Sequence, residues 1–174
     1  MSDTETQAIE RSTAEGFLAH YNAREGTDFR VVTVAGPGES PDVKCVSSSG
    51  DELLLEVTIT EDNPRDAQAL LGRSEHKSLD ALRALLHRVK TGAAKMRVNR
   101  LDGNVLKILI DRLRRKFEKR YGSNVALVVR EAGISWDWEL VLPTVRDAFH
   151  GAPIPFDRGV WLLSLGKDRL TRVF

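Results

Sequence analysis

The segment covering residues 39–60, ESPDVKCVSSSGDELLLEVTIT, contains two extended runs of residues separated by a Ser/Gly turn. This pattern predicts a β-hairpin with strands at 42–46 and 52–60. Side chains alternate across a strand, so Asp42 and Glu56 come together on one face if the register is symmetric about the turn. A hairpin that carries two acidic groups on one face restricts both the fold and the chemistry of the chain.

Glu56 interrupts the apolar run LLLEVTI, and a buried carboxylate must be paired with a cation or bind a metal ion. Mg²⁺ takes oxygen ligands, usually one or two carboxylates together with water and phosphate. The hairpin therefore predicts a site for Mg²⁺ or Mn²⁺ between Asp42 and Glu56. Two alternatives stay open: Asp42 is a turn residue after Pro41, and Glu56 faces water on an edge strand.

Length and composition favour one soluble domain. The chain has 174 residues and 41% hydrophobic content, which is enough for a single core over residues 1–174. Cys45 is the only cysteine, which excludes an intramolecular disulfide and fits a reducing compartment. The polar start and the lack of a long apolar run predict a cytoplasmic protein without a membrane partner.

Basic residues concentrate in the middle of the chain. Residues 65–120 contain sixteen Lys and Arg against six Asp and Glu, a net charge of +10, which leaves −9 for the remainder of a chain whose total is +1. This asymmetry indicates a surface for a polyanion beside an acidic site. Solvated helix faces produce the same pattern and are the alternative interpretation.

Hydrophobic periodicity predicts an α/β protein. The run VALVV is apolar without alternation, which is typical of a central parallel strand covered on both faces. Pro143 is expected in the first turn of its helix, where proline is tolerated. The predicted order is helix 5–24, strands 29–34, 42–46 and 52–60, helical segments 64–100 and 104–121, strand 124–130, helix 140–149 and strand 159–165, with 169–174 pairing back on the last strand.

This order and the hairpin motif resemble the PD-(D/E)xK nuclease superfamily, which has the restriction-endonuclease-like fold. Pro41 and Asp42 match the PD, and Glu56 matches the acidic residue of the (D/E)xK motif. In that family a helix carrying a glutamate precedes a three-stranded antiparallel meander, and Glu10 or Glu15 matches that glutamate. A further helix then crosses to a fourth strand.

The resemblance covers residues 5–165. It implies a mixed central sheet flanked by helices, with a basic helical insertion at residues 64–100 after the third strand. Thr58 stands where the family motif has its lysine. A threonine hydroxyl cannot supply the positive charge that orients the attacking water and offsets the charge developing on the phosphate.

Three lysines are candidates to replace the missing cation. Lys44 follows Asp42 on the same strand face, and Lys107 and Lys116 belong to the predicted helix 104–121. We favour Lys116, because RRKFEKRY resembles the lysine-bearing helix that precedes an LVV-type strand in several uncharacterised relatives.

The resemblance implies a metal-dependent endonuclease or exonuclease that hydrolyses DNA or RNA, with DNA favoured, and it allows a homodimer. Asp42, Glu56, the Val57 carbonyl and Glu10 would hold Mg²⁺ or Mn²⁺, and a lysine would position water. A catalytically inactive nucleic-acid-binding relative and a regulatory protein-interaction module are the alternatives. The predicted nucleic-acid surface consists of four basic residues of the second long helix: Arg112, Arg115, Lys116 and Lys119.

Overall fold

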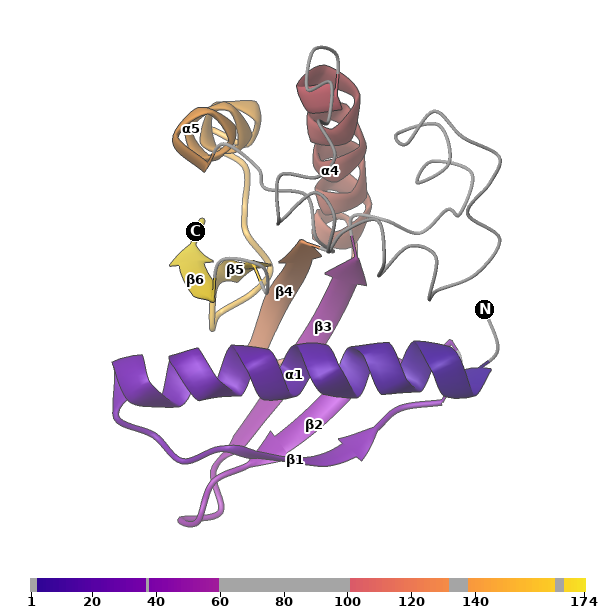
Figure 1. Ribbon diagram of the computed structural model, residues 1–174, viewed down its shortest axis with the longest axis vertical. Helices are drawn as coiled ribbons and strands as arrows, with labels where there is room; N and C mark the ends of the chain where they lie inside the picture. Colours follow the sequence, from indigo (N-terminus) through magenta and orange to yellow (C-terminus); the bar gives the residue numbers. More distant parts are fainter. Residues whose placement is uncertain (1–2, 37, 60–100, 132–137, 165–167) are drawn as a thin grey trace, which may run out of the picture. The chain divides into compact units, whose positions relative to one another are not determined.

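The computed structural model describes residues 3–36, 38–59, 101–131, 138–164 and 168–174 (Figure 1). The helical insertion predicted at residues 64–100 lies outside this part of the chain. Every other predicted element corresponds to an observed one. In chain order these are α1 (Asp3–Glu25), β1 (Arg30–Val34), β2 (Val43–Val46), β3 (Glu52–Ile59), α4 (Leu101–Phe117), β4 (Val125–Glu131), α5 (Trp138–Ala148), β5 (Val160–Ser164) and β6 (Arg169–Arg172).

The strands form one mixed sheet in the order β1-β2-β3-β4-β5-β6. β1, β2 and β3 form an antiparallel meander, β4 and β5 run parallel to β3, and β6 returns antiparallel to β5. The predicted α/β class is therefore confirmed. The run that predicted a central parallel strand is β4, and its residues 125–129 are all buried.

The hairpin has the predicted register. Val43 pairs with Leu55 and Val46 pairs with Glu52, so the hairpin is symmetric about Ser49. Asp42 lies immediately before β2 and not within it as predicted, although its carbonyl oxygen still accepts a hydrogen bond from Ala35 N at 2.8 Å. Extending the register by one residue places Asp42 opposite Glu56.

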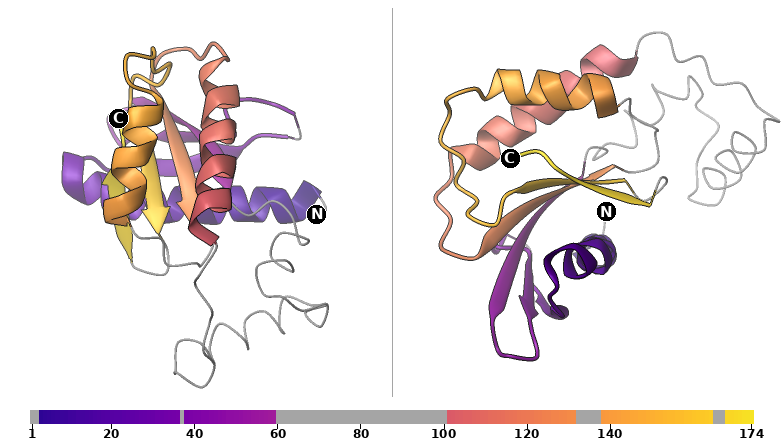
Figure 2. Two further views of the ribbon diagram at one scale, coloured as in Figure 1. Left: turned by 90° about the horizontal axis from the view of Figure 1, so that it is seen from above. Right: turned by 90° about the vertical axis from the view of Figure 1, so that its left-hand side faces the viewer.

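Helices cover both faces of the sheet, with α1 on one side and α4 and α5 on the other (Figure 2). Phe17 and Tyr21 of α1 belong to the same buried cluster as Leu55 and Val57 of β3. Because side chains alternate along a strand, Glu56 points to the opposite face, toward α4 and α5. Buried residues of this second layer include Leu109, Leu113, Leu127, Val129, Val141 and Val145.

Two helix boundaries correct the prediction. α4 ends at Phe117 and not at Tyr121, because its end tightens into a three-residue turn in which Lys119 N donates to Lys116 O at 3.2 Å. α5 begins at Trp138, so Pro143 lies in its second turn and not in its first. The proline there removes only the hydrogen bond to the carbonyl of Glu139, close to the helix start.

The chain divides into two compact units. Residues 1–60 together with 106–174 form the first unit, which contains all six strands of the sheet, and residues 61–105 form the second. The site described below belongs entirely to the first unit. None of the described helices is long and apolar enough to cross a membrane.

Candidate active site

Glu56 is a buried carboxylate at the centre of the candidate site. Glu56 is only 1% exposed, and both carboxylate oxygens accept hydrogen bonds. Lys116 Nζ lies 2.5 Å from Oε1, and the Tyr121 hydroxyl donates to the same oxygen at 3.2 Å. Ser40 Oγ donates to Oε2 at 2.8 Å. Glu56 is therefore buried and paired with the Lys116 ammonium, and it does not face water on an edge strand.

Lys116 reaches Glu56 from a helix sixty positions further along the chain. It follows the buried residue Leu113 by three positions, so the two lie on neighbouring parts of the α4 surface that faces the sheet. The Lys116 side chain is 20% exposed, against 2% for Glu56. The structure thus brings a partly buried ammonium group to the residue that matches the acidic position of the motif.

Asp42 is half-buried beside the same strand. Its Oδ2 accepts a short hydrogen bond, 2.6 Å, from Val57 N. The N–H and C=O of a strand residue point to the same side, so the Val57 carbonyl also faces the strand that carries Asp42. Burial raises the pKa of Asp42, as does the charge of Glu56, while the Val57 N–H and Lys116 lower it.

Glu10 brings a third carboxylate from α1. Its pKa is raised to about 7, first by burial and then by the charges of Asp42 and Glu56, against the opposing effect of Lys116. Glu15, the other candidate on this helix, is exposed. Of the two glutamates proposed from the sequence, Glu10 is therefore the one that interacts with the hairpin site.

The charges of this group fit a divalent cation. Glu10, Asp42 and Glu56 interact electrostatically with Lys116, so these four groups carry a net charge of −2 when all are ionised. Burial first, and then the charges of neighbouring carboxylates, raises the pKa of Glu10 and of Asp42. Oxygen donors of this kind suit Mg²⁺ or Mn²⁺.

Within the described residues, no group of three or more His, Cys, Asp or Glu side chains is arranged to hold an ion by itself. An ion bound here would therefore need the Val57 carbonyl, water or substrate phosphate to complete its ligands, as Mg²⁺ sites commonly do.

The other candidate lysines lie elsewhere. The Lys44 ammonium pairs with the Glu52 carboxylate, and both side chains are about half exposed. Lys107 is exposed on α4. Cys45 is buried, which raises its pKa to about 12, so it cannot act as a thiolate nucleophile at neutral pH. Among the lysines considered from the sequence, Lys116 alone contacts Glu56.

The basic residues predicted to bind nucleic acid flank this site. Lys119 is exposed and close enough to Asp42 to lower the pKa of that carboxyl. Arg112 lies one helical turn before Lys116 and is half-buried, and Arg115 is exposed. Arg112, Arg115 and Lys116 therefore lie in the last turns of α4, and Lys119 follows two residues after the helix ends.

Sequence reasoning did not identify Ser40 or Tyr121 as site residues. Ser40 directly precedes the Pro–Asp pair, which was the only sequence signal for its position. The sequence predicted Tyr121 as part of the helix, but α4 ends four residues before it. The Tyr121 ring packs on the Phe156 ring, with their centroids 4.5 Å apart. Burial and the Glu56 charge raise the pKa of Tyr121, so its hydroxyl stays protonated and donates to Glu56.

The raised pKa of Glu10 predicts a pH dependence of stability with a definite sign. A carboxyl whose pKa is about 7 in the folded protein and 4.5 ordinarily binds more protons when folded, so its contribution to stability is lost as pH rises through this interval. Replacing Glu10 by glutamine should remove part of the fall in melting temperature between pH 5 and pH 8. Glu15→Gln, an exposed change on the same helix, should keep the wild-type profile, and identical profiles for both variants would contradict the assignment.

Comparison of the chain with protein-family models, with curated proteins and with solved structures finds no match in any of the three.

Proposed function

We propose that this protein is a divalent-metal-dependent phosphodiesterase that acts on nucleic acid. The observation that carries the proposal is the contact of Lys116 with Glu56, beside Asp42 and Glu10. It supplies a positive charge at a hairpin whose motif has Thr58 in place of lysine, and a cation at this point is what phosphodiester hydrolysis requires.

The order of the elements supports membership of the PD-(D/E)xK superfamily. Helix α1 carries Glu10 and precedes the β1–β3 meander, in which Asp42 adjoins the second strand and Glu56 lies on the third. Helix α4 then leads to β4, which pairs parallel with β3. This is the sequence of elements that the resemblance implies.

Each residue of the candidate active site has a role in the proposed reaction. Asp42, Glu56 and the Val57 carbonyl would hold Mg²⁺ or Mn²⁺, with Glu10 as a further oxygen donor. When bound, such an ion polarises the phosphate and lowers the pKa of a coordinated water. Lys116 would orient the attacking water and offset negative charge on the phosphate. Ser40 and Tyr121 hold the Glu56 carboxylate in place.

One observation favours a catalytically inactive relative as the second candidate. Glu56 already accepts three hydrogen bonds, so its carboxylate is satisfied without a metal ion. A protein of this kind would keep the buried ion pair as part of its core and bind nucleic acid through α4 alone.

Cleavage and metal binding test the proposal together. The wild-type chain should cleave DNA or RNA with Mg²⁺ or Mn²⁺ and not with EDTA, and Asp42→Asn should lose both the cleavage and Mn²⁺ binding measured by calorimetry. Asp51→Asn, at the exposed hairpin turn, is the matched control. Nucleic-acid binding without cleavage of any single- or double-stranded substrate would support the inactive relative instead.

A further inference from the structure

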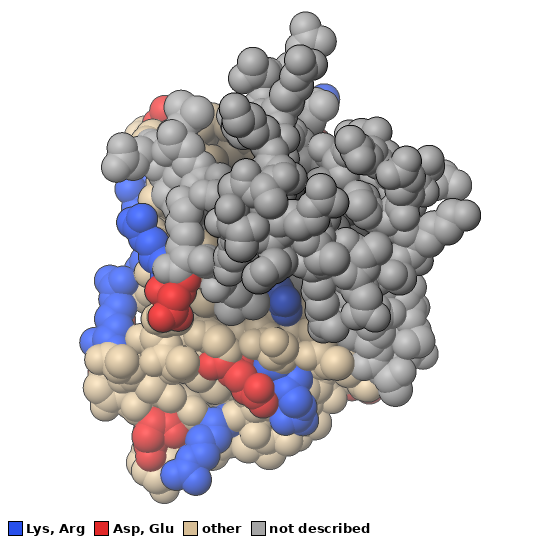
Figure 3. Space-filling model, viewed as in Figure 1, with Lys and Arg blue, Asp and Glu red and all other residues tan. Residues whose placement is uncertain are grey.

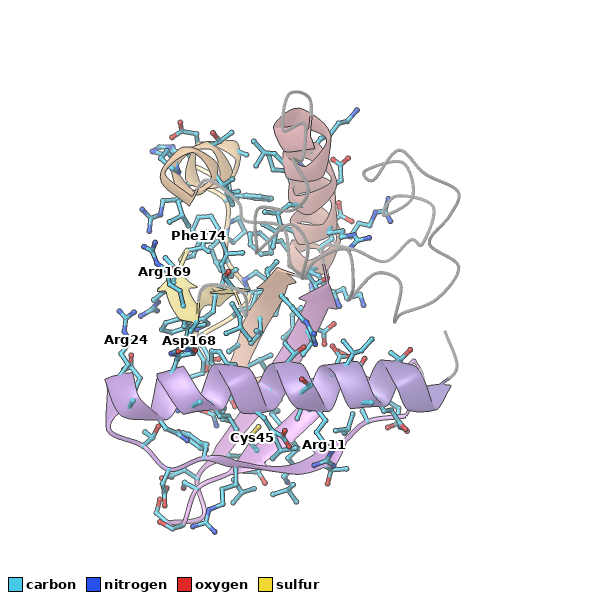
Figure 4. The ribbon with its side chains drawn as sticks, viewed as in Figure 1. Arg11, Arg24, Cys45, Asp168, Arg169 and Phe174 are labelled. Atoms are coloured by element: carbon cyan, nitrogen blue, oxygen red, sulfur yellow. The ribbon has the colours of Figure 1, made fainter. Side chains whose placement is uncertain are left out.

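Five arginines surround β6 and the neighbouring end of α1, away from the carboxylates of the candidate active site. All five are exposed: Arg24 in α1, Arg146 in α5, Arg158 before β5, and Arg169 and Arg172 in β6. Figure 3 shows basic side chains following the left side of this view, and Figure 4 labels Arg24 and Arg169 on that side. We call these residues the β6 arginine row.

Neutral oxygen atoms hold two of these guanidinium groups in place. Arg146 Nε donates to Val173 O at 3.0 Å, and its Nη2 donates to Arg172 O at 3.2 Å. Arg158 Nη2 donates to Asn124 Oδ1 at 2.8 Å. A carbonyl or amide acceptor orients a guanidinium without neutralising its charge, and each group keeps further N–H donors.

Two more members of the row meet at one aromatic ring. The Cζ atoms of Arg24 and Arg172 lie 5.2 Å and 5.5 Å from the centre of the buried Trp161 ring. The ring face attracts each cation, but the two like charges repel each other. Each cation also has an oxygen partner: Glu25 lies 3.3 Å from Arg24, and Arg172 Nε donates to Phe174 O at 2.8 Å.

Acidic side chains adjoin the row. Glu25 pairs with Arg24 at 3.3 Å, and Asp168 pairs with His20 at 3.1 Å. Asp157 accepts hydrogen bonds from the main-chain N–H groups of Asn124 and Val125, both at 2.8 Å. Main-chain and imidazole contacts leave the charges of Asp157 and Asp168 in place, and Asp147 is exposed beside Arg146. Five arginines therefore stand against four acidic side chains, Glu25, Asp147, Asp157 and Asp168, which leaves a net charge of +1.

We propose that the β6 arginine row binds the phosphodiester backbone of a nucleic acid, at a distance from the bond that is cut. This inference rests on the proposed function in taking nucleic acid as the substrate. All five residues are arginine, whose planar fork of N–H donors matches phosphate oxygens better than the point charge of lysine does.

The sheet register gives the separation from the active site. Glu56 pairs with Leu127, Leu127 pairs with Val160, and Arg172 pairs with the next residue of β5. β6 is three strands from β3, which is about 14 Å at the usual strand spacing of about 4.8 Å. Arg172 pairs with Trp161, whose ring packs in the α1 cluster, whereas Glu56 points toward α4, so this arginine and the carboxylate lie on opposite faces of the sheet.

Binding in EDTA tests this surface independently of catalysis. We would measure the affinity of the full chain for a fluorescent twenty-base-pair DNA duplex by anisotropy over a series of salt concentrations. The double variant Arg24→Gln with Arg169→Gln removes two exposed charges of the row. It should weaken binding about tenfold and reduce the slope of log affinity against log salt by about two. The control Arg11→Gln with Arg30→Gln removes two exposed charges elsewhere and should bind like the wild type.

Three outcomes would overturn the inference. Both double variants could weaken binding equally, the Arg24 and Arg169 variant could bind with wild-type affinity, or the wild-type chain could fail to bind the duplex. Binding to an acidic protein in place of nucleic acid would overturn it as well. Cleavage with Mg²⁺, assayed in parallel, separates this result from the proposed function. If the protein binds DNA through the row but does not cleave it, the proposed nuclease activity is contradicted and the inference about the row is retained.

Discussion

Replacing Lys116 by alanine should slow Mg²⁺-dependent cleavage by about a hundredfold or more, equivalent to about 3 kcal/mol of barrier. Glu56→Ala should cause a similar loss, because the ammonium and the carboxylate act on the same transition state. The measurement is the single-turnover rate at saturating enzyme, with Mg²⁺ well above the concentration that the wild type needs.

Lys44→Ala is the matched control. Lys44 pairs with the Glu52 carboxylate, and both side chains are about half exposed, so its removal should leave the cleavage rate near that of the wild type. A loss in Lys44→Ala with none in Lys116→Ala would transfer the role of the missing motif lysine to Lys44. Melting temperature and nucleic-acid affinity, measured on each variant, separate a catalytic loss from unfolding.

The second large effect is on stability. Lys116→Met would leave the Glu56 carboxylate, 2% exposed, without its cation, and should lower the free energy of unfolding by about 3 kcal/mol. Urea denaturation measures this loss. Adding Glu56→Leu should restore most of the stability, because replacing both members of a buried ion pair by apolar side chains is often neutral or stabilising.

Arg114→Met provides the comparison on the same helix. Arg114 pairs with Asp111 at 3.4 Å, and both side chains are about half exposed, so its removal should change the free energy of unfolding by less than about 1 kcal/mol. A loss in Lys116→Met no larger than that of Arg114→Met would show that the Glu56 pair contributes no more than a surface ion pair. In that case the carboxylate would have to be satisfied by Ser40 and Tyr121.

Local patterns in the sequence determined most of the elements and the hairpin register. Strand alternation and the Ser/Gly turn act over a few residues, and they place Asp42 opposite Glu56 without reference to the rest of the chain. The carboxylate inside LLLEVTI likewise predicted a buried charge, because a buried charge needs a partner whatever the fold. The helix ends at Phe117 and Trp138 differed from prediction, because capping and tightening of a last turn depend on surrounding contacts.

Tertiary structure alone decided which groups complete the site. Lys116 and Tyr121 are separated from Glu56 by sixty and sixty-five positions, and no sequence period relates residues at such distances. The β6 arginine row has the same origin, since its members come from four separate segments of the chain. Alternation and helical period specify the direction of a side chain within its own element, while packing of α4 against the sheet and of α1 beside β6 specifies which charges meet.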